Sequence, residues 1–448
     1  MTRYEAQESE FSITASLAEN ISTGQRLMND LTPHAILHRA LSIRPVVSTT
    51  SSCITRQQEA SQSDIQQQLR AIGAGTCGTV FERPRTLEVI KRAKLGYEEA
   101  LFNDCVRHKQ VLESFARQRS LVGLLHVPKC LAYIDEGETE FWTENGYLFP
   151  WVYQTPSALL VTERILPLPR AIRFALIDKY FPEQAKEDAR TSEGNKDCLV
   201  RLYLGKRRDP HRMKPTRASL RNYNLHLDQM EDLALDTRAF AGTMARALAI
   251  MHWDACIDAD DVEFVLGGAP TATAGMSLSA SELKKLGQLK KLGQRITKVP
   301  DISSLNFHRR SVSMWLLDFN RCRPIFVKSD PEDASAEDEG KSPAEKRTKS
   351  VQMAVEAFFR NDPYFPRPLS AKSDEQALWT DFRGIYLETG KAILRKEEDE
   401  VRDLPKRFID MVESEMEKRV ARKAEAVKRL AAMGPRGWEE GSEQETGR

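Results

Sequence analysis

Three glycines in the segment GAGTCGTV have the spacing of loops whose backbone N–H groups surround a phosphate. A dinucleotide-binding turn needs a helix that begins at the glycines, whereas Pro84 and alternating strand patterns follow here. A P-loop needs a Gly-Lys-Ser/Thr sequence, which the segment lacks. Both interpretations are therefore excluded. The glycines and the valine that follows them are Gly73, Gly75, Gly78 and Val80.

The third interpretation is a glycine-rich hairpin that covers nucleotide phosphates, with a strand on each side and a lysine on the next strand. LRAI precedes the glycines, TVF follows them, and Lys91 stands in the strand pattern EVIK. An ammonium group there offers a point charge to phosphate oxygens. The alternative, which these residues leave equally open, is an ordinary turn beside a surface lysine on an edge strand.

Two acidic segments further along the chain add candidate site residues. WLLDFN is an apolar strand pattern that ends at Asp318, and a carboxylate at a buried strand end suits Mg²⁺. In MHWDACIDADDVEFVLGG a long apolar helix leads into an acidic loop, where Asp258 stands five residues before Glu263. Glu263 directly precedes the short strand FVL. The alternative for this loop is a solvated acidic turn that caps a helix.

The elements around these residues predict a small antiparallel sheet followed by a mostly helical region. Residues 66–163 read as short strands with one helix over 97–117, and GYLFPWVYQ reads as a further strand. Residues 164–400 read as helices, including one long helix over 228–253. A link between the two units is expected at Thr162–Ile165, shortly before two prolines.

Polar and low-complexity segments interrupt this pattern. We expect residues 1–65 to be a flexible lead-in with one short helix in HAILHRALSI, and 401–448 to be a charged helix and tail. A leucine and lysine repeat over 283–296 fits a partner-binding surface or a solvated helix, and the charged C-terminal helix is the other expected protein contact. The expected insertions lie at about 183–197, 267–310 and 329–350.

Composition narrows the class of protein. The 448 residues are 41% hydrophobic and 29% charged with a net charge of +1, which gives no overall attraction to nucleic acid or membrane. Seven scattered cysteines, without a CxxC pair, predict no disulfides and no zinc. No apolar run is long enough to span a membrane, and the N-terminus lacks the features of a signal peptide. We therefore expect a cytoplasmic or nuclear protein.

The order of these motifs resembles the protein-kinase-like fold, which includes small-molecule phosphotransferases. More closely, the run from LALDTRAFAGTMARALAIMHW through DADDVEFVLGG resembles an uncharacterised domain of filamentous-fungal proteins, DUF3669, often labelled "zinc finger protein". The cysteine spacing gives that label no support. The resemblance covers about residues 68–395. It implies an α+β, two-lobed fold with a small antiparallel N-lobe sheet plus helix and a mostly helical C-lobe.

The resemblance also implies roles for single residues, with ATP and Mg²⁺ as the cofactors. Asp258 would accept the hydroxyl proton of the substrate, Asp318 and Glu263 would hold the metal, and Lys91 would hold the α- and β-phosphates. The glycine loop and the backbone around Glu163 would bind the rest of the nucleotide. The acidic partner of Lys91 stays open among Glu98, Glu99 and Asp104.

Departures from the family pattern leave the function open. Cys256-Ile257 replaces His-Arg before the candidate base, Asp260 replaces a lysine, and Glu263 replaces an asparagine. We expect an ATP- and Mg-dependent phosphotransferase with a small-molecule acceptor. The alternatives are a catalytically inactive, pseudokinase-like binding or scaffold protein and, less favoured, a nuclear nucleic-acid-binding protein.

Overall fold

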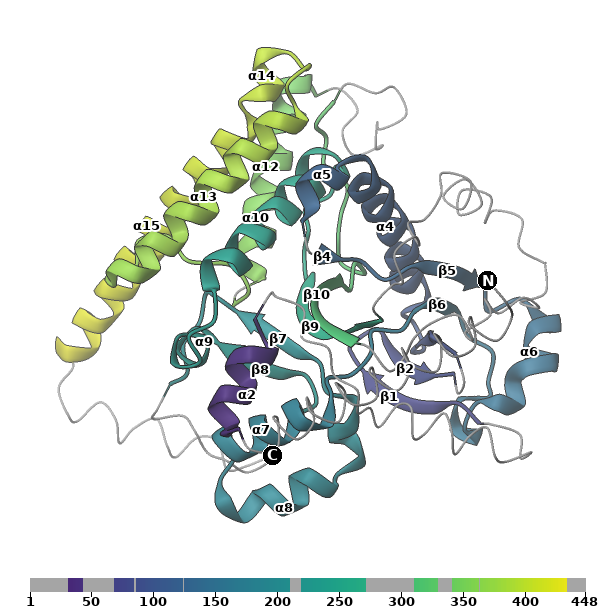
Figure 1. The fold of residues 1–448 in the computed structure, drawn as a ribbon. Helices are drawn as coiled ribbons and strands as arrows, with labels where there is room; N and C mark the ends of the chain where they lie inside the picture. The colour runs from purple at the N-terminus through teal and green to yellow at the C-terminus, as the bar shows by residue number, and fades with distance from the viewer. Residues whose placement is uncertain are drawn as a thin grey trace, which may run out of the picture.

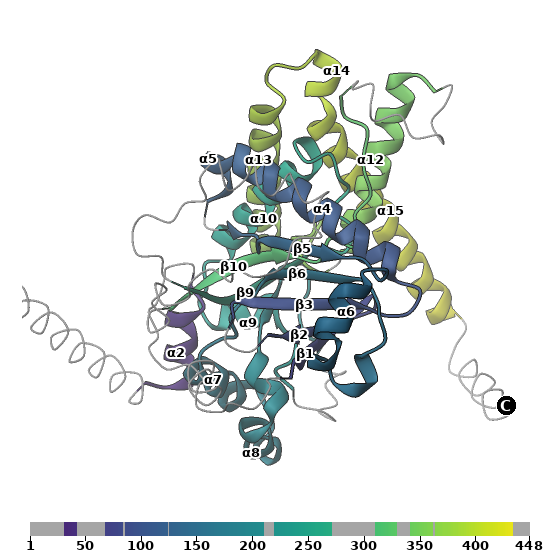
Figure 2. The same ribbon diagram turned by 90° about the vertical axis from the view of Figure 1, so that its right-hand side faces the viewer.

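Two five-stranded sheets with helices around them make up the described part of the chain, seen from two sides in Figures 1 and 2. The arrangement is α+β, as expected. The computed structural model describes residues 31–42, 68–83, 86–123, 125–209, 219–270, 310–328, 341–361 and 363–432.

The first sheet is antiparallel throughout and has the strand order β1-β2-β3-β6-β5. Its strands include the three short ones that the sequence predicted around the glycines. The chain leaves the sheet after β3 and returns as β5 at the far edge. It then forms β6, which pairs with both β3 and β5 and so lies between them. The strands are β1 (Arg70–Ala74), β2 (Gly78–Glu82), β3 (Glu88–Ala93), β5 (Cys130–Ile134) and β6 (Leu159–Glu163).

Helices cover both faces of this sheet. Successive residues of a strand point to opposite faces, and on β3 Ile90 joins a cluster with Phe81 and Trp142, below α6 (Thr139–Asn145). Ala93 instead joins a cluster with residues of α4 (Glu98–Arg117) on the other face. Lys91 stands two residues before Ala93 on the same strand, so its side chain points to the same face of the sheet, towards α4.

The second sheet has the order β4-β10-β9-β7-β8. β9 and β10 pair antiparallel, with Glu263 opposite Leu317, so the start of β9 lies beside the end of β10. This register places Glu263 next to the residue that follows β10, Asp318. The strands are β4 (Leu125–His126), β7 (Val200–Tyr203), β8 (Tyr223–His226), β9 (Glu263–Pro270) and β10 (Arg310–Leu317).

A helical layer packs beyond this sheet. The buried helix α10 (Thr237–Trp253) lies against α13 (Ser373–Ile393), and α15 (Leu404–Ala432) packs on α12 (Pro343–Arg360) and α13 (Figure 1). The remaining helices and 3-10 turns are α2 (Pro33–Ala40), α5 (Arg119–Val122), η1 (Gly146–Leu148), η2 (Trp151–Tyr153), α7 (Arg170–Tyr180), α8 (Glu183–Thr191), η3 (Glu193–Asp197), α9 (Leu227–Asp232) and α14 (Asp399–Arg402).

Several local expectations were wrong. GYLFPWVYQ forms the turns η1 and η2 and no strand. The long helix expected over 228–253 is two helices, α9 and α10, separated near Ala234, whose φ is 49°. Residues 183–197 form α8 and η3.

The low-complexity segment 329–350 ends in α12, which starts with a capping box between Ser342 and Glu345. The repeat at 283–296 lies outside the described residues, as do most of the insertion 267–310 and most of the N-terminal lead-in, whose short helix is α2.

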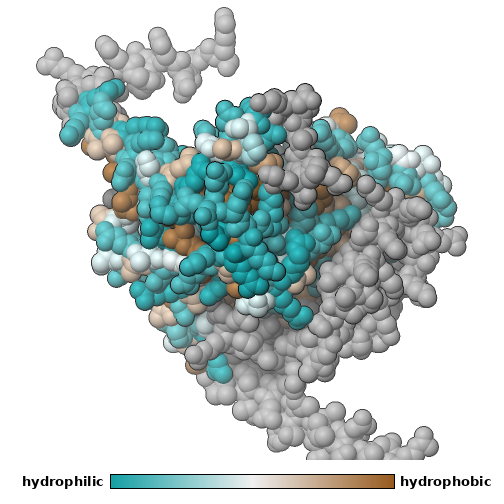
Figure 3. Space-filling model, turned by 90° about the horizontal axis from the view of Figure 1, so that it is seen from above, coloured by the Kyte–Doolittle hydropathy of each residue, from teal (hydrophilic) through white to brown (hydrophobic). Residues whose placement is uncertain are grey.

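The surface and the thiols add little to the site. Figure 3 shows a largely hydrophilic face in which hydrophobic side chains form small separate patches. No described helix combines the length and hydropathy that crossing a membrane requires. The cysteines in the described ranges are free thiols, namely Cys77, Cys105, Cys130, Cys198, Cys256 and Cys322.

Candidate functional site

Lys91 connects the two sheets. Its ammonium group donates to Asp104 Oδ2 on α4 at 2.7 Å and to Asp318 Oδ1 after β10 at 2.9 Å. Burial alone lowers the pKa of Lys91, but the two adjacent carboxylates raise it well above the usual value. Lys91 is therefore a fixed cation between two acids, and of the three candidate partners the structure selects Asp104.

Helix α4 also holds the turn that follows β10. Asp104 uses its second oxygen, Oδ1, to accept the backbone N–H of Phe319 at 3.1 Å. The neighbouring Asn103 donates its side-chain amide to the carbonyls of Asn320 and Cys322, both at 2.9 Å. Phe319 is fully buried and packs on His108 of α4, with ring centroids 5.0 Å apart. Movement of α4 would therefore move the Asp318 turn.

The Asp318 turn has an unusual backbone. Asp318 has φ 66°, a left-handed conformation that is uncommon for a residue other than glycine. Its carboxylate is 27% exposed and so is open on one side. Within the described residues the Oδ1 atom of Asn320 is buried and has no hydrogen-bond partner. An unpaired oxygen two residues after a partly open carboxylate is a candidate ligand atom.

The glycine segment forms the β1–β2 hairpin and leans towards this turn. Gly75 N–H donates to Gly78 O at 2.9 Å, and the Cys77 sulfur, near the tip, accepts the side-chain amide of Asn320 at 3.2 Å. A Cβ on Gly78 would lie 2.6 Å from the carbonyl oxygen of Arg92, so β2 and β3 approach too closely there for any side chain. Gly73 faces Val80 across the hairpin.

Glu263 lies beside Asp318 but is already paired. Its carboxylate forms an ion pair with Arg201 of β7. Burial, opposed by Arg201 and assisted by the Asp318 and Asp261 charges, raises the pKa of Glu263 to about 7. A metal ligand at Glu263 would thus have to leave Arg201 and lose its proton.

The Asp258 carboxylate points into the protein. Its side chain is 0% exposed and accepts from the backbone N–H of Arg323 at 2.8 Å, from Arg323 Nε at 2.7 Å and from Asp260 N–H at 3.2 Å. Burial raises its pKa, and the bonds from Arg323 oppose that rise. Its role as acceptor of a substrate proton stays a prediction, and the side chain would have to be released from Arg323 first.

Glu163 ends β6, at the edge between the two sheets. Its backbone N–H donates to Lys129 O at 2.8 Å, and its carboxylate accepts the Lys129 N–H at 3.1 Å. Burial raises the pKa of the carboxyl group. The next residue, Arg164, is buried and pairs with Glu82 at 2.6 Å and Asp197 at 3.5 Å, which ties the first sheet to η3.

The structure thus brings Lys91, Asp318, Glu263 and the tip of the glycine hairpin to one place. The Asp258 side chain is instead buried in the protein and bonded to Arg323. Sequence reasoning did not single out Asp104, although it falls on the same face of α4 as Leu101 and His108, which are buried. No pattern in the sequence indicated that Arg323 would bind Asp258.

Comparison with known protein families gives a match in the C-terminal part of the chain. Residues 314–398 match the model of the family DUF3669, described as "Zinc finger protein". That description contradicts the expectation of no zinc, which we correct here. Within the described ranges, no group of three or more His, Cys, Asp or Glu side chains could hold a metal ion. No curated protein matches the sequence.

Proposed function

We propose that this chain has a protein-kinase-like fold, binds ATP between its two sheets and transfers the terminal phosphoryl group to a small molecule. The observation that carries the proposal is Lys91, which bonds to Asp104 and Asp318 from two different elements. A buried lysine between two acids, under a glycine hairpin, supports a site for nucleotide phosphates.

The strand order supports the fold part of the proposal. In protein kinases the phosphate-binding lysine stands on the third strand and pairs with an acid of a helix in the same lobe. Here β3 leads into α4, and β6 pairs between β3 and β5. Under this proposal the β9–β10 pair, which has an acid at each adjacent end, would carry the metal-binding residues.

The residues present fit a divalent cation. Asp318 is partly exposed, and the Oδ1 atom of Asn320, two residues further along the chain, has no hydrogen-bond partner within the described residues. Asp318 would hold the ion, with Glu263 as a second oxygen ligand once it leaves Arg201. When bound, the cation would neutralise charge on the phosphates. Lys91 would orient those phosphates, and the glycine hairpin would exclude water from them.

The second candidate is a nucleotide-binding protein without turnover. It is favoured by the complete burial of Asp258 on Arg323 and by the pairing of Glu263 with Arg201. Both arrangements occupy acids that a kinase-like enzyme would use. Binding measurements alone do not separate the two candidates, so turnover must be measured as well.

The test is a thermal shift of the full chain with ATP, ADP and GTP, with and without Mg²⁺ or Mn²⁺. A ligand that binds only the native state stabilises it by about 2.7 kcal/mol at one hundred times its Kd. We expect a shift with ATP that is reduced in Lys91→Met and Asp318→Asn and kept in Lys406→Met, whose side chain is exposed on α15. Equal shifts in all variants would refute the phosphate site.

A further inference from the structure

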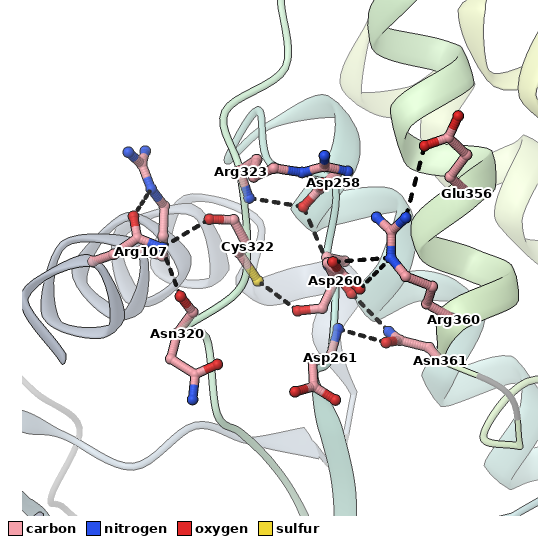
Figure 4. A network of polar contacts seen from close by, with 12 residues as sticks. Arg107, Asp258, Asp260, Asp261, Asn320, Cys322, Arg323, Glu356, Arg360 and Asn361 are labelled. Carbon is pink, nitrogen blue, oxygen red and sulfur yellow. Dashed lines mark hydrogen bonds and ion pairs between the residues drawn. The ribbon is translucent and has the colours of Figure 1, made fainter. Parts of the chain in front are cut away.

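The loop before β9 carries three acids whose surroundings differ sharply. Asp258 is held by Arg323, and Asp260, only 6% exposed, accepts from Arg360 Nε of α12 with both oxygens at 3.1 Å. Figure 4 shows Asp258 and Asp260 turned into this network and the Asp261 carboxylate turned away from it. Asp261 is 53% exposed. Of these three acids it alone presents its carboxylate to solvent.

A clamp from α12 fixes the direction of Asp261. Asn361, which follows α12, accepts the Asp261 N–H at 2.5 Å and donates to the Ala259 carbonyl at 2.7 Å. Asp261 has φ 63° and Ala259 has φ 56°, both left-handed. Such conformations are strained for residues other than glycine and persist only where the surroundings impose them. The loop therefore holds Asp261 outward at an energetic cost.

The position of Asp261 relative to Asp318 follows from the sheet. Asp261 stands two residues before Glu263, which pairs with Leu317, the residue before Asp318. Asp261 and Asp318 therefore lie at the same end of the β9–β10 strand pair. Within the described residues Asp261 has an ion pair with Arg321, at 3.9 Å, and Arg321 is itself 57% exposed. An ion pair this loose and exposed contributes little and leaves the carboxylate available.

We propose that Asp261, in place of Asp258, is the catalytic carboxylate that accepts the hydrogen bond of the acceptor hydroxyl. This inference rests on the proposed function. In the reaction, the bond from the γ-phosphorus to its bridging oxygen breaks and ADP leaves. The acceptor oxygen forms the new bond to phosphorus, and its proton passes to Asp261 and then to solvent. Asp258 is a structural anchor for Arg323.

The first experiment needs no nucleotide. The full chain is treated with a water-soluble carbodiimide and an amine, and the modified carboxylates are located by peptide mass spectrometry. We expect Asp261 to be labelled and Asp258 to be protected. Labelling of Asp258 before Asp261 would overturn the inference.

The second experiment compares turnover in wild type, Asp261→Asn, Asp258→Asn and the control Glu187→Gln, whose side chain is 80% exposed on α8. ATP consumption is measured with water and with a panel of small alcohols as acceptors. We expect Asp261→Asn to keep nucleotide affinity and lose about 10²–10⁴-fold in turnover, the usual effect of removing such a group. The folded fraction of Asp258→Asn should keep its turnover.

The outcomes separate the two proposals. A wild type that binds no nucleotide refutes the proposed function and this inference with it. A wild type that binds ATP but consumes none refutes phosphoryl transfer, and with it the role of Asp261, while nucleotide binding stands. An Asp261→Asn variant that matches an active wild type refutes only the catalytic role of Asp261. A loss of turnover in Asp258→Asn with Asp261→Asn unaffected would return the role to Asp258.

Discussion

Lys91 and Asp318 are 227 residues apart in the chain, and the ammonium group of one lies 2.9 Å from the carboxylate of the other. Lys91 belongs to the first sheet and Asp318 follows the second, so this contact joins the two sheets. Asp104 reinforces it by bonding to Lys91 and to the backbone after Asp318. The site residues are therefore also part of the junction between the two sheets, which links stability to function.

Replacing Lys91 should test that link. Lys91→Met leaves Asp104, whose side chain is only 5% exposed, without its cation, and breaking a buried pair from one side costs about 3–5 kcal/mol. Lys91→Met/Asp104→Leu removes both charges and should recover part of the loss. Urea unfolding of the two single variants, the double variant and the Lys406→Met control measures the coupling. If the losses of stability in the two single variants simply add up in the double variant, Lys91 and Asp104 do not form a buried pair.

His252 should make stability depend on pH below neutrality. It is fully buried, its Nδ1 lies 2.8 Å from the Tyr386 hydroxyl, and burial lowers its pKa to about 3. The unfolded chain binds this proton near pH 6.5 and the folded chain does not. Stability is therefore lost as pH falls from about 6.5 towards 3, by up to about 1.4 kcal/mol per pH unit.

The measurement is the free energy of unfolding between pH 4 and 7.5 for wild type and His252→Asn, which keeps a polar group near Tyr386. The variant should show a smaller loss on acidification. Equal slopes would show that His252 is protonated in the folded protein.

Glu263 should act in the opposite direction. Its pKa is about 7 in the folded protein, mainly because it is buried, and about 4.3 is usual for an unfolded chain. Between these values the folded protein holds a proton that the unfolded chain has released. The contribution of Glu263 to stability is therefore full at low pH and is lost as pH rises from about 4.3 to 7.

Glu263→Gln should remove this dependence, so that stability between pH 5 and 7 rises more steeply in the variant than in wild type. Because His252 and Glu263 oppose each other in this range, the wild-type curve alone hides both effects. A variant with the same curve as wild type would mean that the Arg201 pair keeps Glu263 ionised.

The local pattern of the sequence predicted the elements that carry the site, because alternation and glycine spacing are properties of short segments. The three strands around the glycine hairpin, the helix over 97–117 and the strand before Asp318 are all present. GYLFPWVYQ was mistaken for a strand because its aromatic residues are apolar. Of these residues, Phe149 and Tyr153 pack on Phe81 edge to face, whereas Tyr147 and Trp151 are exposed.

The contacts that define the site depend on long-range register, which a single sequence does not contain. Asp258 and Arg323 are 65 residues apart, and no local pattern indicates that one would bury the other. The clamp of Asn361 on Asp261 spans 100 residues. The motif order therefore predicted an acidic loop near Asp318, while the direction in which each acid points came only from the structure.

A pair of glycine variants tests the hairpin itself. A Cβ on Gly78 would meet the carbonyl oxygen of Arg92 at 2.6 Å and the Lys91 Cγ atom at 3.3 Å, whereas one on Gly75 would meet nothing within 4 Å. Because backbone must shift, Gly78→Ala should cost about 1–3 kcal/mol, and Gly75→Ala should stay within about 0.5 kcal/mol of wild type.

A Cβ added at Gly78 would also press on the aliphatic part of the Lys91 side chain, whose ammonium group bonds to Asp318. Under the proposed function, Gly78→Ala should therefore weaken ATP binding as well as lower the denaturant midpoint. Stability is measured by urea unfolding and affinity by the ATP-dependent thermal shift, each referred to the ligand-free variant. A Gly78→Ala protein as stable as Gly75→Ala would contradict the close approach of β2 and β3. A destabilised variant with wild-type ATP affinity would separate the hairpin from the phosphate site, because the displaced Lys91 would then have no part in binding.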